Sequence, residues 1–277
     1  MSLTLMYITN KPEIAKVAQI AGVDRIWVDM EYIGKEIRQH GMDTVKSHHT
    51  LEDVHNIRKV VTSSELMVRI NPIHDETSYY SNSENEIEDT IQAGADVLML
   101  PMFKTPKEVQ RFVDCVNGRS KTMLLFETMD SVNNIDEILQ IDGIDEVHIG
   151  LNDLHLDYKK KFMFELLCDG TVDYMCDVFK RYNKKFGFGG IARVGFGMLP
   201  AEYIITHHYY LGSTAAILSR GFCDANKIDN PEIVRDLFIE GVSNIRKKED
   251  EVSNYTLRQY KDNYEIIKEI VYKIANG

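Results

Sequence analysis

The chain has 277 residues, a formal net charge of −11 at neutral pH, 44% hydrophobic residues and 27% charged residues. This apolar content is too high for a disordered polypeptide and is typical of a globular protein. The negative charge argues against nucleic acid or an anionic membrane as a partner, because both would repel the chain at long range. An anionic small molecule stays compatible with it, since an arginine or a bound cation can reverse the field inside one cleft.

The sequence does not predict secretion or membrane insertion. The N-terminal stretch lacks the basic and then apolar pattern of a signal peptide. The most apolar run, residues 97–103, is far shorter than the roughly 20 residues that a membrane helix needs. The four cysteines include no CxxC pair. We therefore expect a cytoplasmic protein with reduced thiols.

Short apolar runs alternate with helical patterns along the chain. Most of the runs are nearly continuously apolar, as expected for parallel strands that are buried on both faces. The predicted strands are residues 4–8, 25–30, 66–71, 97–101, 122–128, 146–150, 189–193 and 214–220. Eight strand–helix units predict an α/β protein with a (β/α)₈ TIM barrel. A doubly wound sheet is the alternative, but no GxGxxG motif follows the first strand.

Helices are predicted between the strands from apolar residues at a spacing of three and four. The clearest stripe consists of Val109, Phe112, Val113 and Val116. Prolines in first turns and glycines after last turns mark helix boundaries, namely Pro12, Pro106 and Pro200, and Gly22, Gly94 and Gly212. The glycine-rich residues 187–190 are interpreted as a tight turn before the seventh strand.

The chain is longer than a minimal barrel in three places. Residues 34–50 and 73–86 form extended loops after the second and third strands, on the face where barrels of this type carry their active sites. We expect residues 1–250 to form a single catalytic domain and residues 251–277 a C-terminal helical extension. The extension has an apolar stripe that packs either on its own barrel or on a neighbouring subunit, and we expect a homo-oligomer.

Two carboxylates follow neighbouring predicted strands. Glu127 ends the fifth strand and Asp153 follows the sixth, so both should face the same space at the mouth of the barrel. Such a pair suits Mg²⁺ or Mn²⁺, with water and substrate oxygens as the other ligands. The alternative is structural: Asp153 caps the following helix, and Glu127 pairs with an arginine. Gly150 and Asn152, which come just before Asp153 in the sequence, are expected to bind substrate.

Other candidate side chains lie at the ends of the second and third strands. Arg69 could hold a carboxylate with both arms of its guanidinium, or could form a structural ion pair with Asp29 or Glu31. His48 and His49 are candidates for a general base, although a histidine in a loop is often only solvated. No predicted strand interior carries a lysine, which argues against a Schiff base. Lys104 is the nearest candidate.

Several segments, in order, resemble the HpcH/HpaI aldolase and citrate lyase β-subunit family. They are residues 21–31 (AGVDRIWVDME), 67–71 (MVRIN), 93–109 (AGADVLMLPMFKTPKEV), 124–139 (LLFETMDSVNNIDEIL) and 143–154 (GIDEVHIGLNDL). The last two are the most specific, because ETxxxxxNxxEI followed by GxDxxxIGxxDL goes beyond the general pattern of a barrel. The resemblance implies a phosphoenolpyruvate/pyruvate-type barrel that forms or cleaves carbon–carbon bonds.

The resemblance also implies roles for particular residues. Glu127 and Asp153 match the family's ligands of Mg²⁺ or Mn²⁺, and the metal chelates the 2-oxo acid. Arg69 matches the arginine that supports the developing enolate, and metal and arginine together stabilise the charge that grows on the keto oxygen. Small-molecule partners would then be a 2-oxo acid and an aldehyde.

The sequence departs from the family pattern after Glu31. The pyruvate aldolases of the family have a histidine there that takes part in proton transfer, whereas this chain has Tyr32. A tyrosine with an ordinary pKa near 10 is a poor base at neutral pH. His49, His48 or a metal-bound water would have to replace it. Lys35 and Arg38 in the same loop are expected to bind a more anionic or sugar-like substrate.

Three functions are compatible with these observations. The first is a metal-dependent lyase of the class II aldolase type that acts on an aldol of a 2-oxo acid such as pyruvate. The second is an enzyme that resembles citrate lyase or malyl-CoA lyase and cleaves a thioester-activated substrate. The third is a barrel that has lost the reaction and binds a metabolite.

Overall fold

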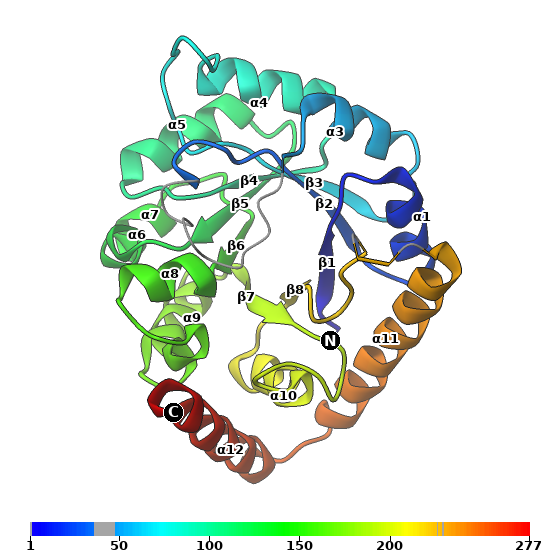
Figure 1. The fold of residues 1–277 in the computed structure, drawn as a ribbon. Coiled ribbons are helices and arrows are strands. Elements are labelled where there is room, and N and C mark those ends of the chain that lie inside the picture. The colour runs from blue at the N-terminus through cyan, green and yellow to red at the C-terminus, as the bar shows by residue number, and fades with distance from the viewer. Residues whose placement is uncertain (1, 36–47, 226, 229) are drawn as a thin grey trace.

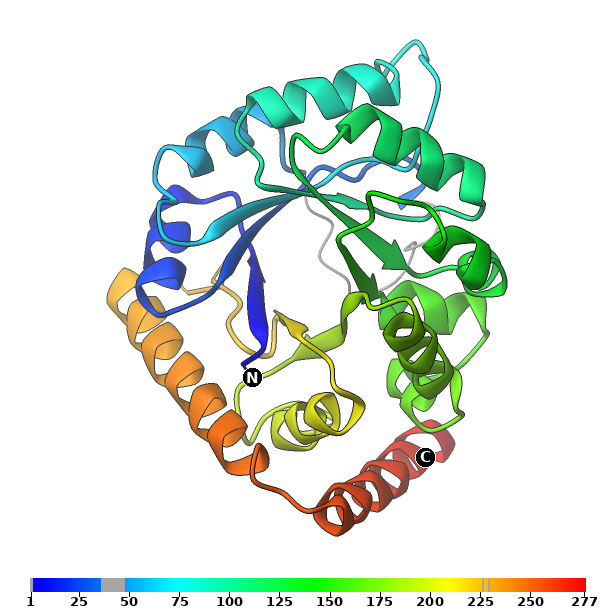
Figure 2. The same ribbon diagram turned by 180° about the vertical axis from the view of Figure 1, so that it is seen from behind.

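A computed structural model of the chain describes residues 2–35, 48–225, 227–228 and 230–277. Within this part of the chain, eight parallel strands close into a barrel in sequential order, and helices surround it (Figures 1 and 2). The strands are β1 (Thr4–Ile8), β2 (Arg25–Asp29), β3 (Glu65–Arg69), β4 (Val97–Leu100), β5 (Lys121–Phe126), β6 (Glu146–Ile149), β7 (Lys185–Ile191) and β8 (Ala215–Leu218). The predicted (β/α)₈ TIM barrel is confirmed.

The strands have buried side chains on both faces, which explains their nearly continuous apolar sequences. In β3, Met67 belongs to the cluster that fills the inside of the barrel, whereas Val68 belongs to the core between the sheet and the helices. Both side chains are fully buried. Alternating directions along a strand thus supply two cores at once, as parallel barrels require.

The helices begin and end where local chemistry favours it. Thr105 accepts a hydrogen bond from the Glu108 N–H, and Pro106 occupies the first turn of α5. Gly212 ends α10 in the left-handed region, at φ 73°. The helices are α1 (Pro12–Ile20), α3 (Leu51–Arg58), α4 (Ser83–Gln92), α5 (Pro106–Val116), α6 (Met129–Asn133), α7 (Ile135–Leu139), α8 (Leu151–Asp157), the 3₁₀ helix η1 (Met163–Leu167), α9 (Thr171–Arg181), α10 (Ala201–Leu211), α11 (Pro231–Val252) and α12 (Leu257–Asn276).

The seventh strand differs from its prediction. Residues 187–190 are not a turn before the strand but lie inside β7, with a register irregularity between Gly187 and Gly190. A Cβ atom at Gly187 would lie 2.4 Å from the Ala215 carbonyl oxygen and 2.5 Å from His148 Nδ1. Glycine is therefore required because β8 and a buried side chain approach the backbone closely, a condition that the sequence alone does not reveal.

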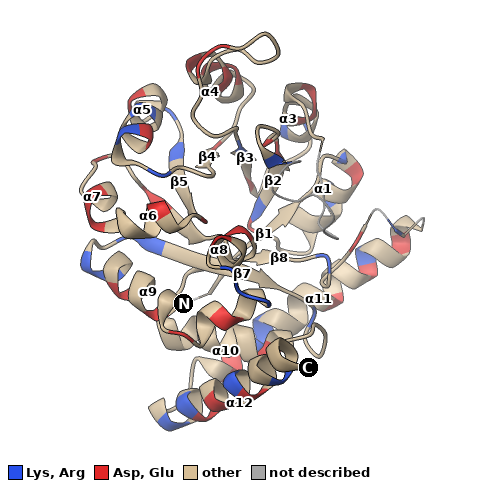
Figure 3. Cartoon of the chain, turned by 60° about the vertical axis from the view of Figure 1, so that its left-hand side comes forward, with Lys and Arg blue, Asp and Glu red and all other residues tan. Residues whose placement is uncertain are grey.

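The C-terminal helix packs on its own barrel. α12 contacts α10 and η1, and its Ile267 and Val271 are buried. Figures 1 and 2 show α11 and α12 as consecutive helices along the outside of the barrel. Both carry acidic and basic residues, as Figure 3 shows. In the described part of the chain, no helix is both long and apolar enough to span a membrane.

Candidate active site

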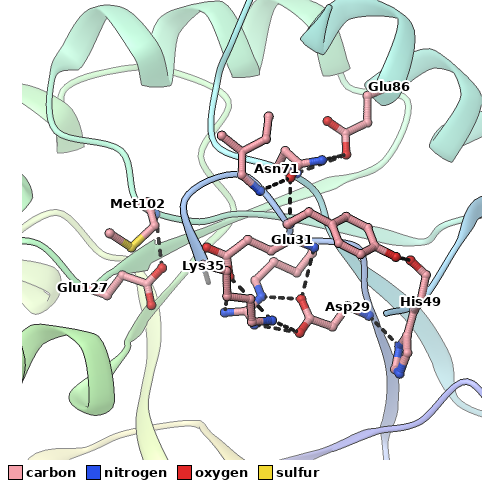
Figure 4. A network of polar contacts seen from close by, with 11 residues as sticks. Asp29, Glu31, Lys35, His49, Asn71, Glu86, Met102 and Glu127 are labelled. Carbon is pink, nitrogen blue, oxygen red and sulfur yellow. Dashed lines mark hydrogen bonds and ion pairs between the residues drawn. The ribbon is translucent and has the colours of Figure 1, made fainter. Parts of the chain in front are cut away.

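The carboxylates predicted from the ends of the fifth and sixth strands meet in one cavity. Glu127 directly follows β5, is 3% exposed, and its Oε1 accepts a hydrogen bond from the Met102 N–H at 3.1 Å (Figure 4). Asp153 lies in the first turn of α8, just after β6. Both line a cavity of about 290 Å³ at the mouth of the barrel. The structure therefore brings the predicted pair together.

The other polar lining of this cavity includes most of the predicted substrate-binding residues. Lys35, Arg69, Gly150 and Asn152 all line it. The apolar lining comes from Trp27, Leu125, Ile149, Leu151, Met163 and Ile217. A polar mouth above apolar walls is the usual form of a small-molecule site.

Gly150 makes room for Glu127. It precedes α8 with φ −80°, and a Cβ atom there would lie 2.8 Å from both the Cβ and the Oε2 of Glu127. Such contacts are too short for any ordinary packing of a side chain. The glycine in GLNDL is therefore needed to seat the carboxylate, in addition to any contact that it makes with substrate.

Asp29, at the end of β2, organises two cations beside the cavity. It is 1% exposed, and Arg69 donates to its Oδ1 from Nε and to its Oδ2 from Nη2, each at 2.8 Å. Lys35 Nζ donates to the same Oδ2 at 2.5 Å (Figure 4). Burial alone would raise the pKa of Asp29, but the charges and hydrogen bonds of Arg69 and Lys35 hold it well below its usual range.

Arg69 forms the structural ion pair and also lines the cavity. Its guanidinium is paired with Asp29 and lies 3.2 Å from Glu31, so the structural ion pair exists. The same side chain lines the cavity and stacks over the indole of Trp27 at 5.0 Å. Burial opposes its charge, but Asp29 and Glu31 raise its pKa well above the ordinary value, so it remains a cation.

The predicted histidines lie elsewhere. His49 is 8% exposed, and its Nδ1 accepts a hydrogen bond from the Asp29 N–H at 3.0 Å. Its ring lines a different cavity of about 320 Å³, together with Tyr32 and Asn71, and burial lowers its pKa. His48 is exposed beside the ring of Tyr32. A catalytic role for either histidine stays a prediction, and Arg38 lies outside the described residues.

Contacts with residues that are distant in the sequence hold Tyr32 away from the cavity of Glu127 and Asp153. Its hydroxyl donates to the His49 carbonyl, and its N–H donates to Asn71 Oδ1 at 2.8 Å. Asn71 is fixed in turn by Glu86, which accepts from both the Asn71 backbone and its side-chain amide (Figure 4). Tyr32 is not among the described residues that line the cavity of Glu127 and Asp153.

Three lining residues with a polar atom in the side chain were not singled out as site residues from the sequence. Trp27 lies under Arg69, His148 is fully buried in β6, and Arg220 follows β8. All three line the cavity of Glu127 and Asp153. Arg220 had a signal, because it lies at the end of a predicted strand as Glu127 does. His148 and Trp27 had none, since only the strand register shows that they point into the barrel.

The residues present fit a hard divalent cation. Glu127 and Asp153 supply carboxylate oxygens, and the missing Cβ of Gly150 leaves a cradle beside Glu127 Oε2. Magnesium and manganese accept two protein carboxylates, with water and substrate filling the remaining positions. A ready-made set of three or more histidine, cysteine or acidic ligands is absent from the described residues. This arrangement suits Mg²⁺ or Mn²⁺ better than a structural zinc ion.

The comparisons with known proteins agree with the fold and the motifs. The model of the HpcH/HpaI aldolase/citrate lyase family matches residues 3–163, more than half of the chain, so the chain belongs to this family. Its named members include aldolases and citrate lyases, which identifies the chain as a member of an enzyme family. No curated protein sequence matches the chain.

Three solved structures illustrate the similarity of fold. An HpcH/HpaI aldolase from Desulfitobacterium hafniense DCB-2 is 15% identical, with a TM-score of 0.59 over 79% of this chain and 86% of that one. An HpcH/HpaI aldolase/citrate lyase family protein from Burkholderia cenocepacia J2315 is 14% identical, with a TM-score of 0.61 over 91% and 95%. Citrate synthase SbnG is 16% identical, with a TM-score of 0.60 over 90% and 95%. At these identities the likeness concerns the fold alone.

Proposed function

We propose that the protein is a metal-dependent carbon–carbon lyase of the class II aldolase type, which cleaves or forms an aldol of a 2-oxo acid such as pyruvate. One observation carries the proposal: Glu127, Asp153 and Arg69 line a single cavity at the mouth of the barrel. Two carboxylates for a cation and one buried arginine are the groups that an enolate-forming reaction needs.

The chain's own residues have distinct parts in this proposal. Glu127 and Asp153 would hold Mg²⁺ or Mn²⁺, and the bound ion would supply Lewis acidity at the keto oxygen. Arg69 faces the same space, and the negative charge of Glu127 contributes to its raised pKa. Its guanidinium stabilises the negative charge that develops as the carbon–carbon bond breaks. Asp29 fixes its orientation through two parallel hydrogen bonds.

The apolar walls contribute by excluding water. Leu125 and Ile149 are 3% and 0% exposed and belong to the strands that precede Glu127 and α8. A poorly hydrated cavity strengthens the interaction of Arg69 and of the cation with an anionic intermediate. The fold therefore supports charge stabilisation rather than chemistry on exposed side chains.

The experiment described below also tests the thioester alternative. The family description includes citrate lyase, and citrate synthase SbnG has a similar fold. A citrate-lyase-like or malyl-CoA-lyase-like enzyme would release its 2-oxo acid or acetyl product only from a thioester. A catalytically degenerate barrel would bind oxalate, a mimic of the enolate, and turn over neither kind of substrate.

The test measures pyruvate release from a panel of 4-hydroxy-2-oxo acids in the presence of Mn²⁺, with and without EDTA. We expect release that stops on chelation. Glu127→Gln should abolish it and weaken Mn²⁺ binding in a direct titration, because an amide loses the charge that attracts the cation. Glu137→Gln, an exposed position on α7, is the matched control. Release that persists in EDTA, or in Glu127→Gln, would overturn the proposal.

A further inference from the structure

Lys35 is a buried lysine in the wall of the cavity that holds Glu127 and Asp153. Lys35 is 4% exposed and lines the cavity together with Glu127, Asp153 and Arg69. Tyr32, at the position that follows the acidic residue, is turned toward the His49 carbonyl instead. The nearest residue of this loop that lines the cavity is therefore Lys35, three residues after Tyr32.

A tight turn delivers Lys35 to this place. Gly34 adopts φ 76°, which L side chains rarely tolerate, and the Lys35 N–H donates to the Tyr32 carbonyl at 3.1 Å. The turn reverses the chain after β2, so that residue 35 comes back over the end of the strand. In the sequence Tyr-Ile-Gly-Lys, the polar residue that lines the cavity is therefore Lys35 and not Tyr32.

Two carboxylates fix the position of the amine. Lys35 Nζ lies 2.5 Å from Asp29 Oδ2 and 3.9 Å from Glu31 Oε2. Arg69 contacts the same two carboxylates, so the cluster contains two cations and two anions. An ammonium held in one position beside a substrate cavity can give a proton and regain it from water.

Other lining groups suit this task less well. The guanidiniums of Arg69 and Arg220 keep their protons throughout the accessible pH range. His148 is fully buried, with its Nε2 3.4 Å from the Gly189 carbonyl oxygen. Lys104, the lysine nearest to the site in the sequence-based prediction, is exposed and is not among the described residues that line the cavity.

We propose that Lys35 is the acid–base residue that exchanges a proton with the aldehyde oxygen of the substrate, an inference that rests on the proposed aldolase function. In the condensation direction, the enolate carbon of the 2-oxo acid attacks the aldehyde carbon and a carbon–carbon bond forms. The π electrons of the aldehyde move to its oxygen, which takes a proton from Lys35 Nζ. The neutral amine then regains a proton from water.

Cleavage is the reverse. The neutral amine of Lys35 accepts the proton of the 4-hydroxyl group, and the O–H electrons form the new carbonyl bond. The carbon–carbon bond breaks, and its electron pair stays on the 2-oxo acid as the enolate. Protonation of that enolate by solvent completes pyruvate and does not need Lys35.

Two reactions of the metal-loaded enzyme separate these steps. Exchange of the pyruvate methyl protons in D₂O, followed by NMR, requires the enolate but no aldehyde. Cleavage of a 4-hydroxy-2-oxo acid requires both. We expect Lys35→Met to retain exchange and to lose cleavage by about 100-fold or more. Lys35→Arg keeps the charge but holds its proton, so we expect the same pattern from it.

Matched measurements keep the inference falsifiable. Lys104→Met is the control, and the thermal midpoint and oxalate affinity of each variant report folding and the integrity of the site. Cleavage at the wild-type rate in Lys35→Met, equal loss of exchange and cleavage, or a pyruvate adduct trapped on Lys35 by borohydride would each overturn the assignment. A wild-type protein that performs neither reaction would overturn the aldolase function itself, and the inference with it.

Discussion

Replacing Gly150 by alanine tests the seat of Glu127, the carboxylate that we propose as a metal ligand. Gly150 has φ −80° and ψ 81°, and alanine adopts such a negative φ without difficulty, so the added methyl group acts through contact and not through backbone strain. That methyl group would lie 2.8 Å from Glu127 Cβ, where ordinary contacts begin at 3.4 Å. Because both atoms are next to the backbone, the end of β5 or the start of α8 must move by about 0.6 Å.

The displacement should reduce metal affinity more than stability. Overpacking against the buried Glu127 costs about 1–3 kcal/mol, which leaves a barrel of this size folded. Misplaced ligands weaken metal binding by about 10–100-fold, and we expect this for Mn²⁺ with Gly150→Ala. Isothermal titration with Mn²⁺ measures the affinity, and urea unfolding measures the stability.

Gly118→Ala is the control for this experiment. Gly118 has φ 68°, and a Cβ atom there meets nothing within 4 Å. Alanine at this position should lower stability by about 1–2 kcal/mol through backbone strain and leave Mn²⁺ binding unchanged. If Gly150→Ala is folded and binds Mn²⁺ as tightly as the wild type, the cradle at Gly150 has no part in placing Glu127, and the reasoning is refuted.

Two other outcomes follow from buried charges. Arg69→Met removes the cation that we propose to support the enolate, so we expect kcat/KM for cleavage to fall by about 10²–10³-fold in a steady-state assay, and an unchanged value would contradict that role. Burial lowers the pKa of His148 and of His207 to about 4, so below pH 6.5 the unfolded chain binds protons that the folded protein does not. Stability should therefore fall as the pH decreases from 6.5 toward 4, by at most about 1.4 kcal/mol per pH unit for each histidine. Urea unfolding at pH 7 and pH 5 measures this, and His207→Phe should flatten the dependence. An equally steep dependence in that variant would show that other groups cause it.

The strands were predictable because their signal is local. β1 coincides with its predicted range, and the other strands overlap theirs, since a run of apolar residues must be buried wherever the sheet closes. The start of β7 was wrong because glycines carry no hydrophobic signal. Gly187 is glycine on account of Ala215 and His148, which are distant in the sequence.

The candidate site likewise contains residues that the sequence predicts and residues that it does not. Arg69 ends β3, Glu127 directly follows β5 and Asp153 lies in the first helical turn after β6, and the ends of barrel strands meet at one mouth whatever the loops do. Their common cavity could therefore be anticipated from spacing. The loop after β2 could not be interpreted in this way, because the directions of Tyr32, His49 and Lys35 depend on contacts with other strands and helices.

The sequence by itself determined the order of strands and helices, the acidic composition and the two motifs that identify the family. These follow from residue types and from their spacing over a few turns or strands. Only the tertiary structure decided which polar residues line the cavity of Glu127 and Asp153. Asn71 and the His49 carbonyl hold Tyr32 away from it, while Lys35, whose amine donates to Asp29, lines it. A buried charge needs a counter-charge close to it, and the fold decides which charged residue is near enough. The distance between two such residues cannot be read from the sequence.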